Sequence, residues 1–203
     1  GLASATRSLE VLAVNDPPGV AGITASTYAE SSSSSKGQTQ PIASGLSLTD
    51  PDGNNQVIRS ASARITTGLR PNEDRLGVQD LADGIAASYD ASTGVLSLSG
   101  EATLAAYEAR LRTLAYSNTS ASPDIRTRTL TITLNDEGGS VGTIQTNIQI
   151  QAFDDPPSVD LNGPDLDGTA SAITALAGQA TRLAPLASLS DPDAGPSRSS
   201  SDI

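Results

Sequence analysis

An internal repeat constrains this sequence more than any other feature. Residues 9–18 read Leu-Glu-Val-Leu-Ala-Val-Asn-Asp-Pro-Pro, and residues 148–157 read Ile-Gln-Ile-Gln-Ala-Phe-Asp-Asp-Pro-Pro, so Pro17 falls on Pro156 at an offset of 139. A second match follows, with one gap, in which Asp50 falls on Asp191 at an offset of 141. Two ordered matches at nearly one offset indicate a chain built from repeating units.

The two matches divide the chain into three parts. We interpret residues 1–14 as the last strand of a preceding repeat, residues 15–153 as one complete repeat, and residues 154–203 as the start of a following repeat. The chain begins at Gly without Met and has no signal peptide, which favours a piece of a longer protein.

Apolar residues within the complete repeat alternate with polar ones, as in strands with one buried face. The turn at residues 90–94 predicts one hairpin, and the turn at residues 136–139 predicts a second. One stretch breaks this pattern. Residues 102–112 have helical spacing, with Ser99 as the expected N-cap, Glu101 at the positive end, and three expected core residues: Leu104, Tyr107 and Leu111.

The composition argues against an enzyme. The 203 residues include no His and no Cys, which removes the imidazole base, the thiolate nucleophile and the Cys/His zinc site. A net charge of −11 disfavours binding to the phosphate backbone of nucleic acids. No stretch approaches the roughly 18 apolar residues of a membrane-spanning helix, so the chain is not expected to be transmembrane.

The motifs of the central repeat resemble the cadherin-like tandem repeats of very large bacterial surface proteins, which are often grouped with RTX-type adhesins. The motifs that carry this resemblance are Val14-Asn-Asp-Pro-Pro18, Tyr28-Ala-Glu30, Asp50-Pro-Asp52, Glu73-Asp-Arg-Leu76, the stretch from Gly94 to Tyr107, Tyr116-Ser-Asn-Thr-Ser120, Arg128-Thr-Leu130 and Asn135-Asp-Glu-Gly138. The second junction departs from the family by reading Phe153-Asp-Asp-Pro-Pro157.

The resemblance implies an all-β fold: a cadherin-like or Ig-like β-sandwich repeat with one short helix, in a tandem array. It also implies export to the cell surface. Neighbouring repeats of the same chain are then the expected partners, with other surface proteins or polysaccharide as alternatives.

Strand order places the acidic residues at the two ends of the sandwich. The end near the first junction is expected to collect Asp16, Asp50, Asp52 and Asp136. The far end and the opening of the next repeat are expected to collect Glu30, Glu73, Asp74, Asp154, Asp155, Asp191 and Asp193. Because Arg75 is the only base expected nearby, these far-end carboxylates need another source of positive charge.

Calcium fits this need, since it takes six to eight hard oxygen ligands in flexible geometry. Cadherin-like junctions use the same kinds of acidic segment in the same order. The candidate calcium ligands are Asp16, Glu30, Asp50, Asp52, Asp74, Asp136, Asp154, Asp155, Asp191 and Asp193. The simpler alternative is that the two Asp-Pro-Asp segments are turns, with Asp first and Pro second.

Two modification sites are weaker hypotheses. The run Ser31–Ser35 is most simply a flexible loop, with O-glycosylation as the lesser alternative. Asn118-Thr-Ser120 fits an N-glycosylation acceptor, but also a turn after a strand.

Three functions remain open from the sequence. The leading hypothesis is a structural spacer repeat in a secreted, calcium-stiffened cell-surface adhesin. The alternatives are a structural subunit of an extracellular filament or sheath, and a carbohydrate-binding accessory module of a secreted enzyme.

Overall fold

The segments in which apolar and polar residues alternate form strands. A strand points successive side chains to opposite faces, so this alternation gives it one apolar face and one polar face. The computed structural model describes residues 6–12, 14–30, 37–53 and 56–163 and, in the C-terminal part, residues 168–169, 172, 174, 177–182, 184 and 186–193. Its strands are β1 (Gly19–Ala21), β2 (Ser26–Ala29), β3 (Gln40–Pro41), β4 (Ser47–Thr49), β5 (Val57–Thr67), β6 (Asp74–Gly77), β7 (Ala86–Asp90), β8 (Val95–Thr103), β9 (Ala115–Asn118), β10 (Arg128–Asp136), β11 (Val141–Gln151), β12 (Ser158–Asp160) and β13 (Ser188–Ser190).

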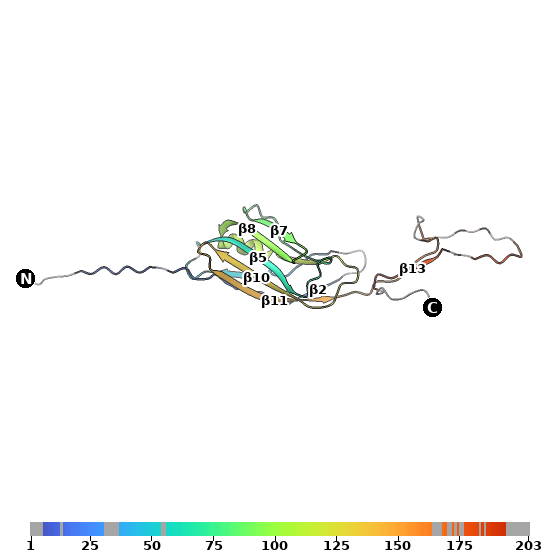
Figure 1. Ribbon diagram of the computed structural model, residues 1–203, viewed down its shortest axis with the longest axis horizontal. Coiled ribbons are helices and arrows are strands. Elements are labelled where there is room, and N and C mark those ends of the chain that lie inside the picture. Colours follow the sequence, from blue (N-terminus) through green and yellow to red (C-terminus); the bar gives the residue numbers. More distant parts are fainter. Residues whose placement is uncertain are drawn as a thin grey trace, which may run out of the picture.

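The strands of the central repeat form one large sheet and two small ones (Figure 1). The large sheet has six strands in the order β2-β11-β10-β5-β8-β7, and a three-stranded sheet has the order β3-β9-β6. β1 pairs with β4, whereas β2 pairs in parallel with β11, so the opening of the repeat is shared between two sheets. Both expected hairpins are confirmed, as β7–β8 and as β10–β11.

The helix α1 (Leu104–Arg112) begins two residues later than the sequence spacing predicted. Thr103, not Ser99, is the N-cap, and its hydroxyl accepts a hydrogen bond from the Ala106 N–H at 3.2 Å. The predicted start was wrong because β8 keeps its pairing with β5 as far as Thr103, and Glu101 therefore belongs to a strand. A continuing sheet ladder satisfies these backbone groups before a helix could.

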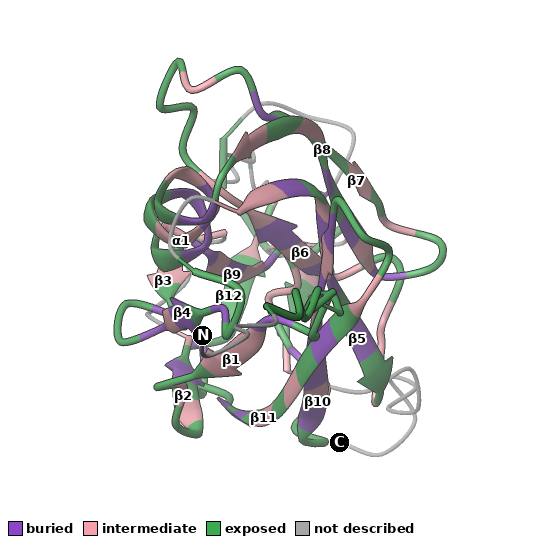
Figure 2. Ribbon diagram, turned by 90° about the vertical axis from the view of Figure 1, so that its left-hand side faces the viewer, coloured by how far each residue is buried: buried purple, intermediate pink, exposed green. Residues whose placement is uncertain are grey.

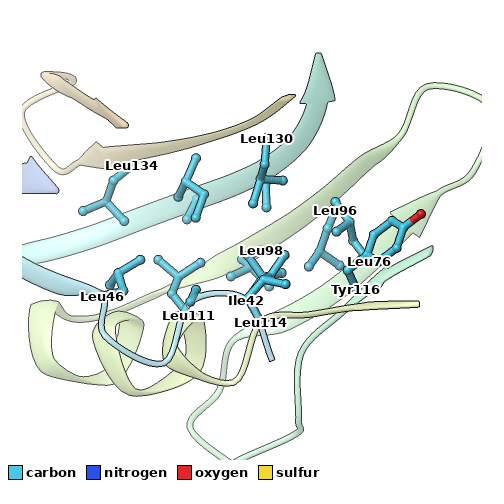
Figure 3. Packing of buried hydrophobic residues seen from close by; sticks show 14 of the residues in the cluster. Ile42, Leu46, Leu76, Leu96, Leu98, Leu111, Leu114, Tyr116, Leu130 and Leu134 are labelled. Atoms are coloured by element: carbon cyan, nitrogen blue, oxygen red, sulfur yellow. The ribbon is translucent and has the colours of Figure 1, made fainter. Parts of the chain in front are cut away.

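The core lies between the six-stranded sheet and a second layer that contains α1, β3, β9 and β4 (Figure 2). Figure 3 shows Leu130 and Leu134 of β10 facing Leu46 and Leu111 across this interior. Tyr107 is fully buried, as predicted for a core anchor, and its hydroxyl donates to the Gly100 carbonyl at 2.6 Å. The chain is therefore a mostly β protein with two packed layers and one short helix, which confirms the predicted all-β sandwich with one short helix.

The start of the next unit repeats the start of this one. β1 pairs with β4 so that Val20 faces Leu48, and β12 pairs with β13 so that Val159 faces Leu189. These pairs are separated by the same offsets of 139 and 141 that align the two sequences. The sequence repeat is thus also a repeat of strand pairing.

Residues 6–12 and residue 14 form no strand and are exposed. Their large apolar side chains, Leu9, Val11, Leu12 and Val14, are 77–87% exposed. The prediction that this segment is the last strand of a preceding repeat stays a prediction, since such a strand needs the sheet of that repeat as its partner.

Candidate junction sites at the two ends of the sandwich

The Asp50-Pro-Asp52 turn holds the segment that enters the sandwich. Asp50 Oδ1 accepts the backbone N–H of Asp52 at 2.9 Å, and the Asp50 carbonyl accepts the N–H of Gly53 at 3.1 Å. This makes the segment the Asp-initiated turn that the sequence offered as the simpler alternative. The turn then presents Asp52 Oδ2 to the backbone N–H of Asp16, which lies 2.7 Å away.

Asp136 fastens the same entering segment from the other side. It is 2% exposed, and its Oδ2 accepts the side-chain amide of Asn15 at 2.8 Å while its Oδ1 accepts the Ser140 N–H at 2.8 Å. Gly138 leaves room for Asn15, since a Cβ at Gly138 would lie 2.3 Å from the Asn15 Cγ. Strand-order reasoning therefore brought the right carboxylates to this end but did not identify Asn15 as a donor. The sequence feature that could have identified Asn15 is its position in the repeated junction motif.

The second junction is held by carboxylates from both of the units that it connects. Glu30 Oε2 accepts the backbone N–H of Phe153 at 3.1 Å, and the Glu30 N–H donates to the Gln151 carbonyl at 2.9 Å. Asp193 Oδ2 accepts the backbone N–H of Asp155, as Asp52 does for Asp16. We call this arrangement of Glu30, Phe153, Asp155 and Asp193 the junction clasp.

Asp191 and Asp154, two further predicted calcium ligands, occupy the positions of Asp50 and Asn15 at the second junction. Asp191 Oδ1 accepts the Asp193 N–H at 3.0 Å, which repeats the Asp50–Asp52 contact. Asp154 is exposed and occupies the place that Asn15 has in the first junction. A carboxylate at this position cannot donate the hydrogen bond that Asn15 donates to Asp136.

Asp74 has a guanidinium partner that the sequence analysis did not assign. Its carboxylate is fully buried against the fully buried Arg128, with Nε–Oδ2 at 3.0 Å and Nη2–Oδ1 at 3.1 Å. The Arg70 N–H, the Tyr116 hydroxyl and the Asn118 amide also donate to it. The premise that Arg75 is the only nearby base was therefore wrong.

This buried network shifts two pKa values upward. Burial and then the hydrogen bond to Asp74 raise the pKa of Tyr116. Burial lowers the pKa of Arg128, but the hydrogen bonds and the charge of Asp74 outweigh burial, so the net shift is upward. Asp74 and Arg128 thus form a charge-neutral structural pair, and a calcium ion could use Asp74 only by displacing Arg128.

Other acidic residues at this end are also paired with arginine. Arg126 donates to Asp124 at 2.8 Å, and Arg70 donates to the same carboxylate. Asn118 is 1% exposed, with its amide bonded within the network, so it is closed to a glycosylating enzyme. The Ser31–Ser35 run lies outside the described residues.

A third guanidinium site anchors the loop before β7. Arg110 is 1% exposed and donates to Asp83 Oδ2 and Asp80 Oδ1, each at 3.0 Å, and to the Ile85 carbonyl at 3.0 Å. The hydrogen bond from Arg110 is the largest cause of the lowered pKa of Asp83. The sequence analysis missed this site because the partners come from a loop and a helix that are 27 residues apart.

The candidate calcium ligands suit a metal ion only if several of their side chains converge on one point. Among the described residues, no three acidic side chains converge closely enough to hold a metal ion. One feature favours a cation: Asp50 is 8% exposed, and its buried Oδ2 has no hydrogen-bond partner in the described part of the chain. Asp52 and Asp136 instead accept backbone and amide N–H groups, so only part of the arrangement suits calcium.

No helix in the described part of the chain has the length and apolarity needed to cross a membrane.

Comparisons with known proteins give a partial likeness. No family model matches the chain. Halomucin from Haloquadratum walsbyi (strain DSM 16790 / HBSQ001) is 39% identical over 115 residues, which cover 49% of this chain and 1% of halomucin. The chain therefore matches a very small part of a very long protein.

One solved structure that resembles the chain is described as the solution structure of the PKD domain from KIAA 1837 protein. It is 11% identical, with a TM-score of 0.26, and the match covers 71% of this chain and 96% of that chain. At this TM-score the fold assignment rests on the strands and core of the chain itself.

Proposed function

We propose that this chain is a structural spacer: a segment of a tandem array of β-sandwich repeats in a long secreted, cell-surface protein. In this role it performs no chemistry and sets the distance and angle between its neighbours. The junction clasp carries the proposal, because carboxylates from two successive units, Glu30 and Asp193, hold the backbone of the linker between them.

Two further observations support the proposal. The opening strand pair and its Asp-Pro-Asp turn occur twice with the same register, as a serial array requires. The match covers 1% of halomucin, which agrees with a repeat that is one of many in a very long protein. Pro156 and Pro157 follow the clasp and restrict the linker further, because proline fixes its own φ and limits the residue before it.

Calcium is a second, separable part of the proposal. We propose that the ion binds at the junctions, where Asp50 Oδ2 and the exposed carboxylate of Asp154 offer oxygens without the N–H donors that occupy the neighbouring carboxylates. At the second junction the ion would bind Asp154 together with Asp193 Oδ1, since the Asp155 N–H donates to Asp193 Oδ2. It would stiffen the clasp further, and it would not be the only element that orders the linker.

A pair of substitutions at Asp193 separates these two parts. Asp193→Asn keeps an oxygen that can accept the Asp155 N–H but removes the charge that calcium needs, whereas Asp193→Ala removes both. We expect Asp193→Ala to broaden the distribution of inter-unit geometries in small-angle scattering and to expose residues 153–157 to protease, with or without calcium.

A clasp with calcium and a clasp without calcium predict different behaviour for Asp193→Asn. If calcium contributes, this variant is as stiff as the wild type in chelator and loses the extra stiffness that calcium gives the wild type. Asp160→Asn is a matched control on the neighbouring strand, since its Oδ1 accepts the N–H groups of its own turn, those of Asn162 and Gly163. Scattering that is unchanged in Asp193→Ala contradicts the spacer clasp. Heats of calcium titration that are equal in all three variants contradict the calcium part alone.

A further inference from the structure

The outer face of the six-stranded sheet is uncovered, and away from the exposed Arg59 and Glu101 at one end it is nearly uncharged. Residues that alternate with the core positions point to this face, and they are half-buried or exposed. We call it the hydroxyl face and define it by Ser60, Ser62, Arg64, Ala86, Ser88, Asp90, Val95, Ser97, Ser99, Thr129, Thr131, Thr133, Thr143, Gln145 and Asn147. Figure 1 shows the strands that carry these residues side by side.

Its charge contrasts with that of the rest of the molecule. The hydroxyl face holds one cation, Arg64, and one anion, Asp90, and is neutral, whereas the whole chain carries −11. Two copies of so acidic a chain repel each other over most approaches. An approach through the hydroxyl face brings neutral surfaces together and keeps the acidic ends apart.

The face is also complementary to itself. Strand register places Thr143, Thr133, Ser62, Ser97 and Ser88 in one row across five strands. A hydroxyl group both donates and accepts, so a row of hydroxyl groups can bond to a copy of itself. A two-fold interface needs this property, because the same patch serves both subunits.

The neighbouring row fixes where the two-fold axis lies. Arg64 on β5 pairs with Val95 on β8, and Val95 pairs with Asp90 on β7. The cation and the anion therefore lie on the two strands that flank β8. Rotation by 180° about an axis parallel to β8 exchanges β5 with β7 and keeps each residue in its own row. Arg64 of each copy then faces Asp90 of the other, and the guanidinium of Arg64 makes no ion pair within the described part of the chain that this would break.

We propose that the hydroxyl face is a lateral docking surface for a second copy of this chain, in this two-fold arrangement. In this arrangement β5, β8 and β7 of one copy face β7, β8 and β5 of the other, because β7 is the edge of the sheet. Three strands about 4.8 Å apart and six residues of about 3.3 Å span roughly 10 Å by 20 Å. The two faces together bury less than the roughly 1,200 Å² of a standard stable interface, so a single pair is weak. In this respect the inference rests on the proposed function, because an array of repeats adds many such weak contacts along two neighbouring molecules.

Sedimentation of this chain across a concentration series tests the docking surface without reference to the junction. We expect the average mass to rise with concentration, and Arg64→Glu to raise the dimer dissociation constant at least about tenfold, since it sets Glu opposite Asp90 twice. The double variant Arg64→Glu with Asp90→Arg should restore association. Arg7→Glu is the matched control: the same change of net charge at an exposed position outside the face.

A cysteine placed on the predicted axis gives a second measurement that does not depend on charge. The chain has no cysteine, so Val95→Cys introduces a unique thiol next to its copy, and a thiol crosslinker of about 10 Å should join the pair. Ala109→Cys, exposed on α1 in the other layer, should not crosslink. A wild-type mass that stays constant into the millimolar range, equal effects of Arg64→Glu and Arg7→Glu, or equal crosslinking at both cysteines would each overturn the proposal. Any of these results would leave the junction clasp standing.

Discussion

The two ends of the sandwich are both rich in carboxylates, but they neutralise them in different ways. At the end that receives the first junction, Asp52 and Asp136 accept N–H groups from Asp16 and Asn15. At the far end, Asp74 is buried against the guanidinium of Arg128. The first end thus ties Asp52 and Asp136 to the linker. The far end ties Glu30 to its own linker in the same way, but it uses Asp74 to hold its own interior together.

This difference separates two roles of acidic residues that look alike in sequence. A carboxylate bonded to a linker N–H transmits force from one unit to the next. A carboxylate paired with a buried arginine contributes to the unit alone, and its removal should not change the angle between units. Substitutions at the two ends should therefore affect different measurements.

The largest effect is expected at the far end. Arg128→Met leaves Asp74 buried without its counter-ion and should lower the free energy of unfolding by about 3–5 kcal/mol, as measured by chemical denaturation. Arg126→Met is the control, because this arginine is largely exposed and its ion pair with Asp124 should contribute less than about 1 kcal/mol. The double variant Arg128→Met with Asp74→Asn should recover part of the loss. Equal losses in Arg128→Met and Arg126→Met would contradict the role given to the buried pair.

A smaller effect is expected at the first end. Asp136→Ala removes the acceptor for Asn15 and for the Ser140 N–H, and should cost about 1–3 kcal/mol. Unlike the change at Arg128, it should also loosen residues 14–16, which hydrogen exchange of the Asp16 N–H would report. Glu137→Ala is the control, since Glu137 is exposed and its ion pair is with the exposed Arg59. Unchanged exchange at Asp16 in Asp136→Ala would show that this end does not hold the linker.

The smallest effect concerns pH and the third guanidinium site. Arg110 lowers the pKa of Asp83 below its usual 3.8, so the folded state binds a proton at Asp83 less readily than the unfolded state does. The resulting stabilisation is present above about pH 4 and is lost as the pH falls through the lowered folded pKa. Thermal unfolding between pH 5 and pH 2 should show a steeper decline in the wild type than in Asp83→Asn. Parallel pH profiles for the two proteins would exclude a contribution from this pair.

Local regularities determined much of the fold from the sequence. Period-2 alternation located the long strands, and both hairpin turns were found because an Asp-rich or Gly-rich turn depends on a few adjacent residues. In the β7–β8 turn, Asp90 accepts the Ser92 N–H at 2.9 Å and Gly94 takes a φ of 67°, a local solution that its own residues dictate. The repeat likewise needed only a comparison of the chain with itself.

Strand direction also placed the carboxylates at their correct ends, but the sequence could not choose their partners. Asn15 and Asp136 are 121 residues apart, and Asp74 and Arg128 are 54 residues apart. Such pairs depend on which strands become neighbours and on how each is aligned, and no local pattern encodes either. The parallel pairing of β2 with β11 and the late start of α1 were decided in the same way, by backbone groups that found partners in the assembled sheet. The sequence determined the strands, their turns and their repetition, because these arise from neighbouring residues. The tertiary structure decided which donor meets each carboxylate, because a buried charge takes the donors that the packed strands bring to it.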